Sequence, residues 1–145
     1  MEKPASLRAA LQAALPELAE HPEKLRLFVT GGHIEPNKAT LGYKQHYILS
    51  IFIEEFAQDP AYLHVALIHW LQTHQPDILG PHKQPQKPIT FEAEPLESDR
   101  WDILIEVQLT ETILAILDPA GRIHIQTKAE PQYNQELAGI IGANR

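Results

Sequence analysis

The feature that most constrains the fold of this chain is a strict alternation of residue types from Trp101 to Thr110. One set of alternate positions is apolar, comprising Trp101, Ile103, Ile105, Val107 and Leu109. The other set is mostly polar, comprising Asp102, Leu104, Glu106, Gln108 and Thr110. Because successive side chains of a strand point to opposite faces, this period of two predicts a strand with one polar face. The other face is expected to be buried in a sheet.

Two more strands are predicted in the first half of the sequence. Residues 25–30 alternate in side-chain type, and we expect this strand to stop near Gly31 and Gly32, a pair that permits positive φ. Residues 42–56 predict a long strand whose second face becomes apolar halfway along. We therefore expect this strand to be covered on one side at its start and on both sides at its middle.

The second half of the sequence predicts further strands. Residues 89–94 alternate in type, and residues 112–117 are apolar nearly throughout. Residues 118–121 place Pro and Gly as in a hairpin turn, and Ile123 and Ile125 indicate a short returning strand.

The first predicted helix lies near the N-terminus, where leucines recur at helical spacing at positions 7, 11, 15 and 18. Pro16 lacks an N–H group and crowds the preceding turn, so we expect a kink or a restart of the helix there.

A second helix is predicted from Asp59, as N-cap, and Pro60, as first helical residue, to Gln75. Its core stripe comprises Leu63, Ala66, Leu67, Trp70 and Leu71. Val65 and Ile68 fall outside this stripe. A helix that is apolar beyond its core stripe is either deeply buried or in contact with a partner.

The order of these elements is helix, strand, strand, helix, and then three or four strands. This order favours a single α+β domain, with a mostly antiparallel sheet of five to six strands and two main helices packed on one face. We assign residues 1–128 to this domain. Residues 129–145 lack clear periodicity and are interpreted as a C-terminal extension, flexible or ordered on assembly.

Charge and composition disfavour several classes of partner. The formal net charge of −7 opposes binding to nucleic acid, because the Lys and Arg residues are scattered and only Lys83 and Lys87 approach a basic patch. Without cysteine there is no disulfide and no thiolate ligand or nucleophile. No apolar run reaches the roughly 20 residues of a membrane span, and the N-terminus lacks the apolar core of a signal peptide. We expect a soluble protein.

Eight histidines raise the question of a metal site. His64, His69 and His74 are spaced by five residues on the second helix, which turns successive side chains about 140° apart around the axis. Metal-binding pairs on helices have a spacing near four. We interpret these histidines as solvated, capping or packing residues and expect no metal or cofactor.

Catalytic motifs are not found in the sequence. The acidic pairs Glu54–Glu55 and Glu92/Glu94 lie where the polar face or the end of a strand is expected, which favours solvated carboxylates over an acid–base pair. No serine has the context of a nucleophile elbow, and the glycines form no phosphate-binding pattern. We expect a protein that is not an enzyme.

The remaining candidates are residues for binding other proteins. Four prolines make residues 76–88 a stiffened, exposed loop, and loops of this length are often functional. The candidate interface residues, which the core does not obviously require, are Val65, Ile68, Lys83, Lys87, Ile140 and Ile141.

Several segments, in this order, resemble the phage tail completion protein R family of temperate phages with contractile tails. They are Pro4–Leu11 with Leu15–Leu18 and Lys24–Val29; Tyr43–Ile53 with Asp59–Pro60; Trp70–Leu79; Phe91–Glu94; and Trp101–Glu111. Together they cover about residues 3 to 118, and Trp70–Leu79 is the most specific. The chain departs from the family pattern at residues 81–88 and after residue 129.

The resemblance implies a structural protein without catalytic residues. It implies action at the head-proximal end of the tail, where growth stops and the head joins, in a ring of six copies. The implied partners are tail tube or sheath proteins and head–tail connector proteins, and the implied location is the virion tail, assembled in the host cytoplasm. An adaptor or immunity-type binding protein is the alternative, and a small hydrolase with a His/Glu site ranks last.

Overall fold

A computed structural model describes residues 1–81 and 87–130, and residues 82–86 and 131–145 lie outside its description. The helices are α1 (Lys3–Ala14), α2 (Pro16–Glu20) and α3 (Pro60–His74), with 3-10 turns η1 (Pro22–Lys24) and η2 (Pro76–Ile78). The strands are β1 (Leu25–Pro36), β2 (Tyr43–Phe56), β3 (Ile89–Pro95), β4 (Trp101–Leu117) and β5 (Ile123–Lys128). The predicted α+β class and order of elements are confirmed.

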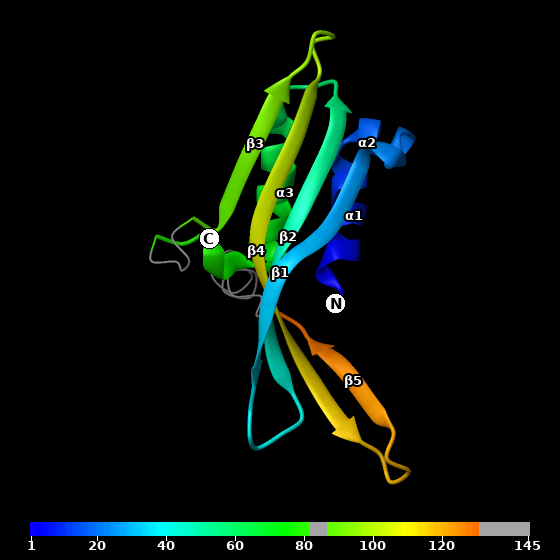
Figure 1. The fold of residues 1–145 in the computed structure, drawn as a ribbon, viewed down its shortest axis with the longest axis vertical. Coiled ribbons are helices and arrows are strands. Elements are labelled where there is room, and N and C mark those ends of the chain that lie inside the picture. The colour runs from blue at the N-terminus through cyan, green and yellow to red at the C-terminus, as the bar shows by residue number, and fades with distance from the viewer. Residues whose placement is uncertain (82–86, 131–145) are drawn as a thin grey trace, which may run out of the picture.

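The five strands form one antiparallel sheet. β1, β2, β4 and β3 lie side by side in that order, and β5 pairs with the far end of β4. In Figure 1, α1 and α3 lie behind the same face of the sheet. We call this the helix face and the opposite side the open face.

The core lies between the helices and the helix face of β2 and β4. Cross-strand pairs such as Leu49↔Val107 and Ile51↔Ile105 are completely buried there. From the helices, Leu7, Leu11, Leu18, Leu63, Leu67, Trp70 and Leu71 pack into the same core. The apolar set of the alternating segment from Trp101 to Thr110 therefore faces the helices, as expected.

The described helices lie on one side of β2, and the open face on its other side has no second layer among the described residues. Ser50 is buried on that face, and its hydroxyl lies 3.2 Å from that of Thr30. Ile48 and Phe52 on the same face are only partly buried, and the guanidinium of Arg26 lies 5.0 Å from the ring centre of Phe52. The expected cover on both sides of the middle of this strand is therefore present only in part.

Both helix boundaries expected at prolines are present. α1 ends at Ala14, and α2 begins at Pro16, so the first helix restarts where the proline removes a backbone donor. The Asp59 carboxylate accepts a hydrogen bond from the Ala61 N–H at 2.8 Å, which caps α3 as predicted.

The expected end of the first strand at Gly31 and Gly32 is wrong. β1 continues to Pro36, with a bulge between Val29 and Gly31. A Cβ atom at position 32 would lie only 2.5 Å from the carbonyl oxygen of His46. Gly32 therefore permits close approach of two paired strands, and the glycine pair does not end the strand.

The strands are much longer than the helices that cover them. With 15 residues, α3 spans about 22 Å, whereas the 17 residues of β4 span about 56 Å. The sheet consequently extends past the helices as two hairpins, which project together at one end of the molecule (Figure 1). We call them the β4–β5 arm (residues 112–128) and the β1–β2 arm (residues 33–44).

Candidate functional site

A buried polar junction lies where the helices end and the β4–β5 arm begins. Gln75 Oε1 accepts from the Thr110 N–H at 2.9 Å, and Lys3 Nζ donates to the Thr110 carbonyl oxygen at 2.6 Å. Lys3 Nζ also donates to Gln75 Oε1 at 2.6 Å. Thr110 lies between Val107, where pairing with β3 ends, and Thr112, where pairing with β5 begins. The side chains of Gln75 and Lys3 therefore provide hydrogen-bond partners for the backbone of Thr110, which lies in the gap between the pairing with β3 and the pairing with β5.

A second part of the junction surrounds the buried carboxylate of Glu111. The Tyr47 hydroxyl donates to Glu111 Oε2 at 2.5 Å, and the Glu2 N–H donates to Oε1 at 2.8 Å. Burial, and then the hydrogen bond to Glu111, raise the pKa of Tyr47. Burial lowers the pKa of Lys3, and the carboxylate of Glu130, 3.0 Å from Nζ, opposes that change. The junction holds the N-terminus, the end of α3 and the base of the arm together.

The β4–β5 arm carries a concentration of exposed apolar side chains. Five of them are between 47% and 71% exposed: Leu114, Ile116, Leu117, Ile123 and Ile125. Strand register places Leu117, Ile123 and Ile125 on one face of the hairpin and Leu114 and Ile116 on the other. A two-stranded hairpin with apolar residues on both faces is unstable against water unless a partner covers it.

A hydrogen-bonded turn forms the tip of this arm. Gly121 has a φ of +82°, and Asp118 Oδ1 accepts from the backbone N–H groups of Ala120 and Arg122, each at 2.9 Å. His124 Nε2 lies 2.8 Å from Asp118 Oδ2. The hydrogen bond with His124, followed by that from Arg122, lowers the pKa of Asp118. The predicted turn at residues 118–121 and the returning strand are confirmed.

The outer face of α3 is a second apolar surface. Val65 and Ile68, predicted to lie off the core stripe, are 65% and 42% exposed, and Tyr62 beside them is 59% exposed. Tyr62 and Val65 line a shallow, mainly apolar depression between α3 and the end of α1, together with Ala14, Leu15, Ala61, Ala66 and His69. We call Tyr62, Val65 and Ile68 the α3 patch.

The other predicted interface residues are only partly covered by the structure. Lys87 is exposed, two residues before the start of β3. Lys83, Ile140 and Ile141 lie outside the described residues, as does most of the predicted extension 129–145. Their role in binding stays a prediction.

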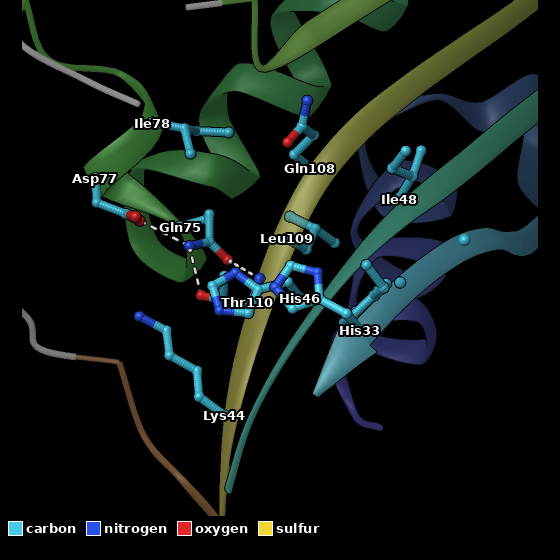
Figure 2. A pocket seen from close by; sticks show the side chains of 13 residues that line it. His33, Lys44, His46, Ile48, Gln75, Asp77, Ile78, Gln108, Leu109 and Thr110 are labelled. Atoms are coloured by element: carbon cyan, nitrogen blue, oxygen red, sulfur yellow. Dashed lines mark hydrogen bonds between the residues drawn. The ribbon is translucent and has the colours of Figure 1, made fainter. Parts of the chain in front are cut away.

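A groove of about 430 Å³ with a mixed polar and apolar lining lies beside the junction, between η2, β4 and the β1–β2 pair (Figure 2). Figure 2 shows Gln75 joined by hydrogen bonds to Thr110 and to Asp77, with His33 and His46 on the neighbouring strands. The lining combines imidazole, amide and carboxylate groups with the apolar side chains of Ile48, Ile78 and Leu109.

The histidines of α3 have packing or surface positions. His74 stacks on Trp70 with ring centres 4.5 Å apart, and His64 meets Phe91 edge to face at 4.8 Å. His69 is exposed. Glu54, Glu55, Glu92 and Glu94, considered above as acid–base pairs, are all exposed.

Sequence reasoning missed a different histidine cluster. His33, Glu35 and His46 lie together on the open face of β1 and β2. The available signal was the spacing of His33 and Glu35, two residues apart as for neighbours on one face of a strand. It was hidden because the strand was expected to stop at Gly31 and Gly32.

The fold and its exposed side chains define an α+β protein with two apolar surfaces, one on the β4–β5 arm and one on α3. Comparison with known proteins narrows this class. The family model described as P2 phage tail completion protein R (GpR) matches residues 1–131, and the chain belongs to that family. Tail completion protein R of Escherichia phage P2 is 35% identical over 132 residues, covering 90% of this chain and 84% of that protein. No solved structure matches significantly.

The family assignment confirms the predicted structural role in phage tail completion. The family consists of structural tail proteins and not of enzymes, which disfavours the hydrolase alternative, and the adaptor alternative gives way to a role in the tail. Such a role implies interaction with tail and head components. Among the described residues, no helix is long and apolar enough to cross a membrane.

Proposed function

We propose that this chain completes a contractile tail at its head-proximal end, as a ring of six copies. In this proposal the ring ends the growth of the tail on tube or sheath proteins and presents a surface to the head–tail connector. The family assignment supports the tail role. The six-fold ring rests on the symmetry expected of contractile tails.

The observation that carries the proposal is the β4–β5 arm. A closed ring requires heterologous contacts, in which one surface of a copy meets a different surface of the next. The arm and the α3 patch are two such surfaces, both apolar and located in different parts of the chain. We propose that the arm of one copy packs on the α3 patch of its neighbour through the face that carries Leu117, Ile123 and Ile125, which would bury Ile123 and Ile125 of one copy against Val65 of the next.

The terminal residues have a place in the same proposal. Residues 1–128 form the ring-building domain, and residues 129–145 are an extension that contacts neighbouring tail proteins, with Ile140 and Ile141 in the contact. Lys83 and Lys87 would meet acidic groups on those neighbours. Hydrogen exchange on free and assembled protein tests this part: assembly should increase protection in residues 129–145.

Electron microscopy of lysates tests the role directly. A phage or lysogen lacking this gene should give full heads separate from headless or overlong tails, and the intact gene should restore complete particles. The double variant Ile123→Lys/Ile125→Lys should fold normally, because both side chains are exposed in the single chain, but should restore few or no particles, because a buried lysine at a docking surface is costly. Thr90→Lys, at an exposed strand position outside the arm, is the matched control and should restore particles.

The outcomes separate the parts of the proposal. Normal infectious particles without the gene would refute the completion role. A clear deletion defect that the arm variant repairs as well as the intact gene would retain the role and refute docking through the arm. Circular dichroism and denaturation of the purified variants distinguish lost docking from lost folding.

A further inference from the structure

The cluster on the open face of the β1–β2 pair consists of His33, Glu35 and His46. His33 and His46 are direct cross-strand partners, and Glu35 is two residues beyond His33, so all three side chains share one face. Their nearest ligand atoms lie within 4.8 Å of one another. His46 Nε2 is 2.6 Å from Glu35 Oε1, and the two imidazole rings stack with centres 4.4 Å apart.

We propose that His33, Glu35 and His46 bind one divalent transition-metal ion of the Zn²⁺ type. Two imidazole nitrogens and one carboxylate oxygen are a donor set that zinc takes at about 2.0–2.2 Å, with water or another ligand in the fourth position. Ligands of one tetrahedral ion at such bond lengths lie about 3.4 Å apart, so rotations of exposed side chains bring three atoms within 4.8 Å into range. Hard ions such as Mg²⁺ prefer sites made of oxygen ligands only.

The hydrogen bonds within the protein engage only two of the three side chains of this cluster. The hydrogen bond between His46 and Glu35 accounts for two members, whereas His33 makes no side-chain hydrogen bond within the part of the chain that the structure describes. A metal ion gives the ring nitrogens of both histidines a common partner. Lys44 is the cross-strand partner of Glu35 and lies on the same face of the sheet.

The surroundings permit both access and a structural effect. His33 and His46 line the groove beside the junction, so solvent or a ligand group can reach the open coordination position. The ion would join β1 to β2 beyond the bulge at Thr30, at the base of the β1–β2 arm. Bound metal would thereby hold the arm in one register, and it would stabilise the native chain because the unfolded chain lacks the arranged ligands.

Metal titration of the full chain, purified without a polyhistidine tag, tests this site. Calorimetry with Zn²⁺ should show one saturable site per chain, and Co²⁺ should give the intense visible absorption of four-coordinate cobalt. The single variants His33→Gln, Glu35→Gln and His46→Gln should each weaken Zn²⁺ binding at least tenfold. His124→Gln is the matched control, because His124 is also an exposed strand histidine beside a carboxylate but has no third ligand among the described residues, and binding should be unchanged.

Two results would overturn the proposal. One is a native chain that shows no saturable binding of Zn²⁺ or Co²⁺. The other is native-like affinity in all three cluster variants, which would place any binding elsewhere. A thermal shift with Zn²⁺ that is present in the native chain and in His124→Gln, and absent in His33→Gln, provides a second readout that does not depend on phage assembly.

Discussion

The two ends of β4 have similar composition but opposite environments. Ile103, Ile105 and Val107 are completely buried, whereas Leu114, Ile116 and Leu117 are about half exposed or more. The difference arises from the layer behind the strand: α3 covers the first part of β4, and the helices end at the polar junction. Apolar strand residues thus stabilise the fold where helices cover them, and they stay exposed, available to the docking proposed above, where the helices have ended.

The largest expected difference between the two ends is in stability. Ile105→Ala should lower the free energy of unfolding by about 3 kcal/mol, because it removes buried methyl groups and leaves a cavity. Ile116→Ala, the same change at the exposed end, should lower it by less than about 0.5 kcal/mol. Urea denaturation of both purified variants measures these values. Equal losses would show that the arm is already packed in the isolated chain, contrary to the comparison.

A smaller effect is expected at the boundary. Gln75→Leu should cost roughly 2 kcal/mol, since it leaves the Thr110 N–H without this acceptor and removes one of the three acceptors of Lys3 Nζ. Gln72→Leu makes the same chemical change at an exposed position of α3 and should alter stability by less than about 0.5 kcal/mol. If the two variants unfold at the same urea concentration, the junction does not contribute to stability as the contacts indicate.

The helix-covered half could be predicted from sequence because its signals are local. The alternation at residues 101–109 fixed which side chains face the core, and Asp59 and Pro60 fixed the start of α3. Pro16 likewise placed the break between the first two helices. Each of these features depends on neighbours within a few residues, which is the range over which periodicity and capping act.

The arm and the histidine cluster could not be predicted in the same way. Residues 112–117 are apolar, and such a run is equally consistent with a buried strand and with an exposed docking strand. The lengths of the elements distinguish these two cases, because a helix of 15 residues is too short to cover a strand of 17 residues. Gly32 was interpreted as a strand end, whereas its role is the approach to His46, a contact set by strand pairing.

The smallest predicted effect concerns Tyr47, and it depends on pH. Tyr47→Phe removes the hydrogen bond to the buried carboxylate of Glu111 and should cost about 1.5 kcal/mol near pH 7. The pKa of Tyr47 is raised in the folded chain, so its stabilising contribution is complete below the unfolded value near 10 and is lost as pH rises above it. The stability difference between native chain and variant should therefore shrink by about 1.4 kcal/mol per pH unit above pH 10.

Denaturation at pH 7, 9 and 11 measures that difference. Tyr43→Phe, on the same face of β2 but outside the junction, is the matched control, and its stability should follow the native chain throughout. A Tyr47→Phe deficit that stays constant up to pH 11 would mean that Tyr47 ionises as readily in the folded chain as in the unfolded one. The junction would then be open to water. The helix-covered half of β4 would in that case end before Glu111, and Glu111 would belong to the exposed arm.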